Sequence, residues 1–346
     1  MVRLTTFVMS LTIIETFFTF LLVQVGNLVA LIQGQLFETL VQPAMFQLGL
    51  SEYVEAAFEG TEWFVIGLLE ISFLALVLQP LEKVWPVERN QDRQSIRIDM
   101  LYTCLHRLGA FTLIFFFSID PLLDHLTAFL HLEGFKPFNL EDLWPAVTGH
   151  AWISFVIYLV VLDFVDYWYH RAEHQFDWWW SLHSLHHSQR SMTLWSDDRN
   201  HLLDDLLRDV TFALVANLIG VPPSQFIWLV VLTRVLQSLQ HANLRCSFGW
   251  LGERLLVSPR FHRTHHAIGF GHEVHHDKTG STVRGCNFGV LLPIWDMLFG
   301  TADFRKNFEA TGIRDQLPPP LGKARNYGQG FWQQQWFGIK RLLNQA

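Results

Sequence analysis

The chain has 346 residues, of which 50% are hydrophobic and 16% are charged, and its formal net charge is −7. This composition is unlike that of a soluble domain and predicts a membrane protein. The negative charge excludes a nucleic-acid partner, which requires a basic face, and three scattered cysteines exclude a disulfide framework.

Long apolar segments follow one another from the N-terminus, each long enough to cross about 30 Å of hydrocarbon. They cover 4–32, 62–82, 100–120 and 150–169. The first is too long for the apolar region of a signal peptide, so we expect a retained membrane helix. A further segment, 209–241, is interrupted by Pro222 and Pro223, which predicts a hairpin of two shorter helices. The expected fold is an all-α polytopic membrane protein with about four transmembrane helices, a broken membrane hairpin and a cytosolic helical cap.

The distribution of basic residues predicts the orientation of these helices. The loop 83–99 holds Lys83, Arg89, Arg93 and Arg97, whereas the segment "SEYVEAAFEGTE" before the second span has glutamates and no basic residue. Because lysine and arginine collect on the cytoplasmic side, the 83–99 loop should be cytoplasmic. Counting spans from that loop places every histidine cluster on the cytoplasmic face of the membrane.

The C-terminal segment after "LPPPLG" at 317–322 contains Trp332, Trp336, Lys340 and Arg341. This combination of aromatic and basic residues predicts a short helix at the membrane interface. An ordinary packed tail explains the same residues equally well.

Seventeen histidines occur in the chain, and five of them lie in "YHRAEHQFDWWWSLHSLHHSQR", Tyr169 to Arg190. Residues three and four apart share a face of a helix, so each box should present its rings together. The boxes are "HRAEH" with His170 and His174, "HSLHH" with His183, His186 and His187, and "HRTHH" with His262, His265 and His266. His241 at the end of the hairpin and His201 in "DDRNHLLDD" stand near them in the chain.

A bound metal is the simplest explanation for these clusters, because grouped imidazoles are costly to bury without one. The isolated His106, His125, His131 and His150 need only be surface or capping residues. Ten clustered histidines exceed the needs of two tetrahedral zinc ions. Two ions of higher coordination number fit better, and redox iron with positions open to O2 suits a site beside lipid.

The ordered boxes resemble those of the membrane fatty acid hydroxylase and sterol desaturase superfamily. "DFVDYWYHR" before the first box, "RNHLL" after the second and "NFGVLLPIWDMLFGT" at 287–301 are also similar, and the resemblance covers roughly 100–303. "SPRFHRTHH" and the ending "WDMLFGT" look most like the alkylglycerol monooxygenase branch. The resemblance divides the chain into N-terminal transmembrane helices with a cytoplasmic loop (1–99), a fatty acid hydroxylase-like catalytic domain (100–303), and a C-terminal linker and interfacial tail (304–346).

The resemblance implies a non-haem diiron site, with two Fe ions, that uses O2 to hydroxylate or desaturate a C–H bond of a lipid such as a sterol, fatty acyl chain or alkyl lipid. It implies as metal ligands His170, His174, His183, His186, His187, His201, His241, His262, His265 and His266, with no catalytic residue beyond them. Asp163 or Asp166 either orients a ligand ring or is only a residue of the cytosolic cap or a partner of a membrane-helix dipole. Asn287 is either a ligand or a turn residue. Because the chain has no G-x-G-x-x-G motif and no cysteine set, an external electron donor is implied: a reductase, cytochrome, ferredoxin or pterin.

One segment departs from the superfamily pattern. After the third box stands "AIGFGHEVHHDKTGSTVRGC", with a further H-x-x-H-H formed by His272, His275 and His276. Its glycines predict a loop, which carries these histidines either as incidental residues or as an accessory site.

Two other functional classes also use clustered histidines. A zinc metallohydrolase would need glutamate directly after the first histidine of H-E-x-x-H, whereas "HRAEH" places Glu173 three residues on. A membrane metal transporter would need ligand-bearing helix pairs, but Glu15 and Glu70 fall in separate spans. We expect the oxygenase.

Overall fold

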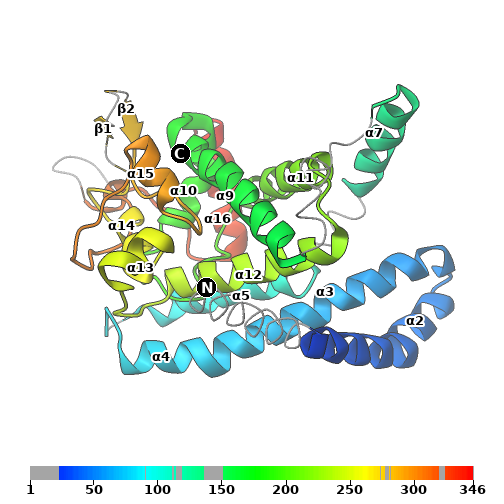
Figure 1. Cartoon of the computed structure of the whole chain (residues 1–346). Helices are drawn as coiled ribbons and strands as arrows, with labels where there is room; N and C mark the ends of the chain where they lie inside the picture. The colour runs from blue at the N-terminus through cyan, green and yellow to red at the C-terminus, as the bar shows by residue number, and fades with distance from the viewer. Residues whose placement is uncertain are drawn as a thin grey trace, which may run out of the picture.

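Helices form almost all of the regular structure in the computed structural model (Figure 1). It describes residues 23–89, 91–110, 113, 119–135, 151–272, 274–276, 280, 282–318 and 324–345. Residues 23–36 are helical. They are followed by η1 (Phe37–Val41), α2 (Gln42–Gln47), η2 (Ser51–Tyr53), α3 (Val54–Phe73), η3 (Leu74–Leu78), α4 (Gln79–Val84), α5 (Arg93–Arg107) and α7 (Asp120–Leu132).

The second half of the chain carries the histidine boxes. Its elements are α9 (Ala151–Gln175), α10 (Asp177–His187), α11 (Leu202–Leu218), α12 (Pro223–His241), α13 (Gly249–Leu255), α14 (Pro259–His265), β1 (Val274–His276), β2 (Thr282–Arg284), α15 (Ile294–Phe299), η5 (Arg314–Gln316) and α16 (Phe331–Leu342). The two strands pair antiparallel, with His275 opposite Val283. In Figure 1, α3 and α4 run below α9, α10, α12 and α14, the helices that bear or border the histidines.

Two helices in the described residues are long and apolar enough to cross a membrane. They are Ser51–Val84, which joins α3, η3 and α4, and Trp152–Gln175, which is nearly all of α9. They include the predicted span 62–82 and residues 152–169 of the predicted span 150–169. Of the predicted span 4–32, residues 1–22 lie outside the described part of the chain.

The helix of the predicted span 100–120 is interrupted in its first half, and most of the second half lies outside the described residues. Helix α5 begins after Asp92, whose side chain accepts a hydrogen bond from Gln94 N, and ends at Arg107. Gly109 then takes a positive φ of 84°, which breaks the helix. Residues 111, 112 and 114–118 lie outside the described residues.

The predicted division of 209–241 into two helices is confirmed, and its insertion in a membrane stays a prediction. Helix α11 ends at Leu218, and α12 begins at Pro223 with Pro222 in an extended conformation before it. Proline at the first helical position satisfies the geometry of a helix start and stops the preceding helix. The turn is held against α9, because the Tyr158 hydroxyl donates to the carbonyl oxygen of Gly220 at 3.0 Å.

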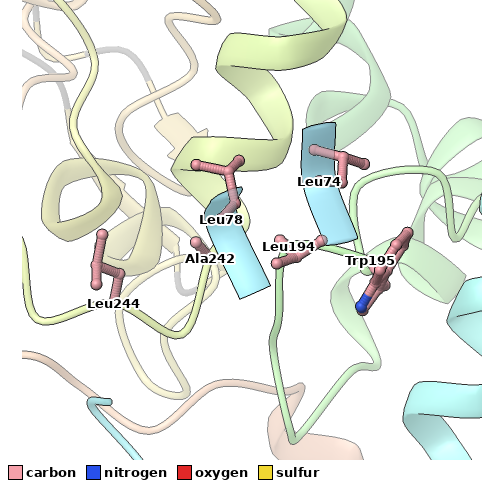
Figure 2. Close-up of a cluster of buried hydrophobic side chains, with 6 residues drawn as sticks. All are labelled: Leu74, Leu78, Leu194, Trp195, Ala242 and Leu244. Carbon is pink, nitrogen blue, oxygen red and sulfur yellow. The ribbon is translucent and has the colours of Figure 1, made fainter. Parts of the chain in front are cut away.

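A hydrophobic cluster joins the first membrane-length helix to the histidine-bearing half. Figure 2 shows Leu74 and Leu78 of η3 beside Leu194 and Trp195, which follow α10, and Ala242 and Leu244, which follow α12. Leu74 and Leu194 are fully buried. The cluster therefore fixes the chain directly after the second box and directly after His241.

The C-terminal helix α16 has two different faces. Phe331, Gln335 and Arg341 are buried against α10 and α5, and Arg341 Nε donates to the carbonyl oxygen of Ser181 at 2.9 Å. Trp332 and Trp336 are exposed, at 78% and 57%. The helix predicted for the tail is thus present, with one packed face and one aromatic face in the open.

Candidate metal centre

The first two histidine boxes lie on consecutive helices that pack against each other. Helix α9 continues from its apolar part to Gln175, so His170 and His174 lie one turn apart on the same rigid helix. Phe176 then takes an extended conformation, and α10 begins at Asp177. This bend folds α10 back so that its histidines face those of α9.

The third box lies on α14, a short helix with a well-formed start. Ser258 caps it by accepting a hydrogen bond from Phe261 N at 3.1 Å, and Pro259 occupies the first turn. The cap is anchored in turn, because Ser258 Oγ donates to Glu253 at 2.8 Å. The helix is only seven residues long, and His266 is its C-terminal cap.

Four histidines of α9 and α10 form what we name the first group: His170, His174, His183 and His187. One nitrogen of each lies within 4.8 Å of the corresponding nitrogens of the others, and all four residues are buried. The Nε2 atom of His187 is 3.1 Å from Nε2 of His174 and 3.1 Å from Nε2 of His183. These nitrogens converge on one point.

A second group of four comes from three helices: His186, His241, His262 and His266. The Nε2 atom of His241 is 3.1 Å from that of His186 and 3.0 Å from that of His262. The Nε2 atoms of His262 and His266 are 3.1 Å apart. Because α10 presents His186 to one group and His187 to the other, the two groups are neighbours.

His265 lies between the groups. It forms a third close set with His187 and His266, and its ring centroid is 4.4 Å from that of His170. Its Nε2 is buried and has no hydrogen-bond partner among the described residues. Nine of the ten predicted ligands therefore meet in one two-part cluster.

The nitrogen spacing fits metal binding. Two imidazole nitrogens about 2.1 Å from one ion are roughly 3.0 Å apart at a right angle and roughly 3.4 Å apart at a tetrahedral angle. The Nε2 separations of 3.0 to 3.1 Å match the right angle. The arrangement therefore suits ions of five or six ligands better than tetrahedral zinc.

The opposite nitrogen of several rings is held by a backbone carbonyl. Nδ1 of His170 lies 3.0 Å from Phe288 O, Nδ1 of His265 lies 2.7 Å from Cys286 O, and Nδ1 of His241 lies 2.8 Å from Gln237 O. A carbonyl can only accept, so Nδ1 carries the proton and Nε2 keeps its lone pair. The lone pairs therefore point into the cluster, as metal ligation requires.

His183 has carboxylates instead of a carbonyl at its Nδ1. Glu173 and Asp204 each place an oxygen 3.3 Å away. Burial alone would lower the pKa of His183, but the two carboxylates raise it to about 10. Negative charge at Nδ1 makes Nε2 a stronger donor to a cation.

Burial lowers the pKa of the other histidines on α10 and α14, and repulsion from neighbouring imidazoles adds to the effect. All of these pKa values lie well below the ordinary histidine value: His186, His187, His262, His265 and His266. The rings are therefore neutral at physiological pH, which is the form that binds metal.

His201 is the predicted ligand that the structure does not bring into the cluster. Its Nδ1 accepts a hydrogen bond from Leu203 N at 3.2 Å and so caps α11, while its Nε2 donates to Gln335 O at 3.0 Å. Both nitrogens are therefore occupied. Gly338 of α16 packs directly on this ring, since an added Cβ would lie 2.3 Å from its Cδ2 atom.

The predicted orienting aspartates bind other groups instead of ligand rings. Asp163 accepts from Leu291 N, Leu292 N and Trp295 Nε1 at 2.8, 3.1 and 2.9 Å. Asp166 pairs with Arg208 at 2.6 Å. The prediction that either contacts a ligand ring is wrong, because α9 directs these two side chains to the 291–295 segment and to α11.

Asn287 is a turn residue and not a cluster member. It has a positive φ of 57°, and its side chain donates to Phe261 O and Asp303 O and accepts from Asp303 N. This brace holds the segment whose neighbouring carbonyls, Cys286 O and Phe288 O, orient His265 and His170.

Sequence analysis missed the acidic residues that support the rings. Asp197 places Oδ1 3.4 Å from Nδ1 of His241, and Asp296 accepts from Phe288 N and Gly289 N at 2.8 and 2.7 Å. Glu173 and Asp204 stood inside quoted motifs, "HRAEH" and "DDRNHLLDD". Their spacing gave no signal of which ring they would reach.

Comparison with known proteins matches this region to a family. A sequence model of the fatty acid hydroxylase family matches residues 155–301, which include all nine clustered histidines. The chain is 28% identical over 242 residues to the ornithine lipid hydroxylase OlsE of Rhizobium tropici, covering 69% of this chain and 66% of that protein. It is 27% identical over 235 residues to alkylglycerol monooxygenase of Homo sapiens, covering 66% and 46%.

A sterol desaturase is also similar. The Delta(7)-sterol 5(6)-desaturase ERG3B of Gibberella zeae is 28% identical over 155 residues, 44% of this chain and 47% of that protein. The chain spans just under two thirds of the ornithine lipid hydroxylase and about half of the other two. No solved structure matches the chain. The predicted resemblance to this superfamily, including its alkylglycerol monooxygenase branch, is confirmed.

Proposed function

Because residues 155–301 match the sequence model of the fatty acid hydroxylase family, we propose that the chain is a membrane-bound oxidoreductase that hydroxylates or desaturates a C–H bond of a lipid. The relatives named for ornithine lipid, alkylglycerol and sterol chemistry support a polar lipid or sterol as the substrate class. We further propose that the two histidine groups hold two non-haem iron ions.

One observation carries the proposal: nine buried histidines from α9, α10, α12 and α14 converge as two adjacent groups with Nε2 spacings of 3.0 to 3.1 Å. Iron bound in these groups would supply the activation of O2 that removal of a hydrogen from a lipid methylene requires. All-nitrogen neutral ligands suit iron, and five- or six-fold coordination leaves positions open.

The protein's own residues prepare and protect the site. The Phe288, Cys286 and Gln237 carbonyls fix the tautomers of three ligands, and the carboxylates at His183 strengthen a fourth. Such supporting partners typically change metal affinity or activity by about 10–100-fold. Burial of all nine rings excludes bulk water, which limits side reactions.

Electrons must reach the site from outside the chain. The sequence has no dinucleotide-binding glycine motif, and Cys104, Cys246 and Cys286 are free and apart. We therefore propose an external donor: a reductase, cytochrome, ferredoxin or pterin.

A hydrolytic zinc site is less well supported. The general base of such a site must reach a metal-bound water. Glu173, the acidic residue of the first box, instead lies at Nδ1 of His183, on the side of the ring away from the other group members. We therefore retain the oxygenase.

We propose that the chain is an integral membrane protein with its histidines on the cytoplasmic side. The two membrane-length helices support the first part. The basic segment 83–99, which begins at the end of one of them and runs into α5, supports the second through the excess of lysine and arginine on the cytoplasmic side.

The proposal is tested by metal analysis and Mössbauer spectroscopy of detergent-purified protein grown with iron. We expect about two irons per chain as a coupled pair, one for each four-histidine group. The double variant His183→Ala, His186→Ala, which removes one ring from each group, should lose them. The matched control is His125→Ala, His131→Ala, because these histidines lie on α7, away from both groups, and should keep the iron.

Lipid extracts of cells expressing the protein under isotopically heavy O2 test the reaction. Incorporation of one heavy oxygen atom into a lipid indicates hydroxylation, and loss of two hydrogens indicates desaturation. Both should vanish in the double variant. Tightly bound zinc without iron after growth on iron alone would exclude the oxygenase.

A further inference from the structure

The turn that follows the third histidine box presses back onto that box. Gly271 N donates to Ala267 O at 3.0 Å, and an added Cβ at Gly271 would lie 1.7 Å from the carbonyl oxygen of His265. Gly285, with φ of 117°, also passes close to this turn, since an added Cβ there would lie 2.5 Å from the Gly271 carbonyl oxygen. Only residues without side chains allow such an approach. The next residue, His272, is therefore held against the cluster.

The ring of His272 packs on the first group. Its centroid lies 4.4 Å from that of His187, edge to face, and 5.7 Å from that of His174, with an angle of 12° between the planes. Trp180 of α10 lies 5.0 Å away and also contacts both of these histidines. His272 therefore packs beside two members of the first group.

Both ring nitrogens of His272 are buried, and neither makes a hydrogen bond of normal geometry to any described residue. An imidazole carries at least one N–H whether or not the ring is charged, and leaving a buried N–H unpaired is costly.

His272 also lies outside the sets of nitrogens that are close enough to share an ion. Two nitrogens that bind the same ion at about 2.1 Å each are at most roughly 4.2 Å apart. His272 therefore fits a position beside the ion better than a position on it.

We propose that His272 donates a hydrogen bond to a small polar or anionic molecule bound at the first group, on the ion that His170, His174, His183 and His187 would hold. This inference deepens the proposed function and rests on it. It places His272, the first histidine of the segment after the third box, beside Trp180 and next to the position where an added ligand would bind the ion.

Azide binding to cobalt(II)-loaded protein tests the proposal, with the visible cobalt spectrum as the readout. Cobalt content should be equal in the wild type and His272→Ala. The azide Kd should rise at least about tenfold in His272→Ala, since a hydrogen bond to a charged group is lost. His272→Asn and His272→Gln place an amide N–H near the positions of Nδ1 and Nε2, and at least one of them should recover part of the affinity.

The control is His276→Ala, which changes the same segment within β1 and should leave the azide Kd unchanged. An unchanged azide Kd in His272→Ala overturns the proposal. Loss of cobalt from that variant also overturns it, because His272 would then be a ligand. An equal effect of His276→Ala would show a role of the segment's fold and not of the ring. Failure of lipid oxidation with the azide result intact would instead reject the proposed function alone.

Discussion

At the scale of single residues, the partner of each ring's outer nitrogen decides how the site works. Backbone carbonyls serve His170, His265 and His241, whereas His183 is the ring at which two carboxylates meet. Carbonyls fix orientation, and carboxylates add negative charge. His183 should therefore be the strongest donor of the first group.

Replacement of Glu173 by glutamine tests this residue-level difference. Glu173→Gln keeps the size of the side chain but removes one negative charge at Nδ1 of His183. We expect the affinity for one of the two ions to fall by about tenfold, measured by competition with a chelator. Glu52→Gln, an exposed site, is the control. Unaltered affinity would mean that Asp204 alone supports the ring.

Neutral buried histidines contribute to the pH dependence of the metal-free protein. The pKa values of His186, His187, His262, His265 and His266 are lowered on folding. Below pH 6.5 the unfolded chain binds protons at these positions that the folded chain does not, so their contribution to stability falls as pH falls. His183, whose pKa is raised to about 10, acts in the opposite sense, and so do Asp197 and Asp296, because burial raises the pKa values of their carboxyl groups to about 7 and about 6.

Replacement of one ring by an amide isolates the histidine contribution. Between pH 7 and pH 5, the stability of metal-free His266→Gln should fall less, or rise more, than that of the metal-free wild type. Each lowered histidine contributes about 1.4 kcal/mol per pH unit below its unfolded pKa. Thermal unfolding of both proteins in detergent at a series of pH values measures the difference. An identical pH dependence in the two proteins would contradict a neutral His266 ring in the folded state.

At the scale of helices, α3 is coupled to the site through α5. Gly67 lets α3 approach so closely that an added Cβ would lie 1.7 Å from Arg107 O. The Arg107 side chain then pairs with Asp197 at 3.1 Å, and Asp197 lies 3.4 Å from Nδ1 of His241. A helix outside the matched residues 155–301 thus helps to position a histidine of the second group.

Two glycines of α3 allow a matched test of this coupling. Gly67→Ala forces α3 and α5 apart, because the clash is with backbone and cannot be relieved by a rotamer change. We expect a lower Tm and a reduced content of the second ion. Gly60→Ala, where nothing lies within 4 Å, should be neutral or slightly stabilising. Full metal content in Gly67→Ala would show that α3 does not influence the site.

At the scale of the whole molecule, the histidine cluster ties together helices from distant parts of the chain. His174, His187, His241 and His262 come from α9, α10, α12 and α14, and their rings lie in the two adjacent buried groups. Bound ions would join these four helices. Metal binding should therefore be a large part of the stability of this domain.

Removal of metal tests this dependence. At a free concentration of about a thousand times Kd, an ion stabilises the fold by about 4 kcal/mol. We expect chelation to lower the Tm by several degrees and to expose α14 to proteolysis, with recovery on addition of ferrous ion. A Tm that is the same before and after complete removal would argue that packing alone holds the four helices.

Sequence patterns predicted the helices that bear the boxes, because the period of an α-helix fixes which residues share a face. His170 with His174, and His183 with His187, needed no tertiary information. The proline pair likewise predicted the turn between α11 and α12. These features are local, so the sequence carries them directly.

The hydrogen-bond partners of the rings could not be predicted, because they depend on which distant segments of the chain meet in space. Asp163 and Asp166 precede the first box yet bind the 291–295 segment and Arg208. His201 follows the second box yet caps α11 beneath α16. Asp197 reaches His241 from 44 positions away in the sequence. The spacing of residues along the sequence does not indicate such contacts.

The unbroken course of α9 has a consequence for which carbon atom is oxidised. If this helix crosses the bilayer, the rise from Trp152 to His170 is roughly 27 Å, close to the full hydrocarbon thickness. The helix would then hold the ions at the depth of the lipid head groups. Carbons next to the head group meet the site directly, whereas a methylene in mid-chain must first be drawn up out of its leaflet.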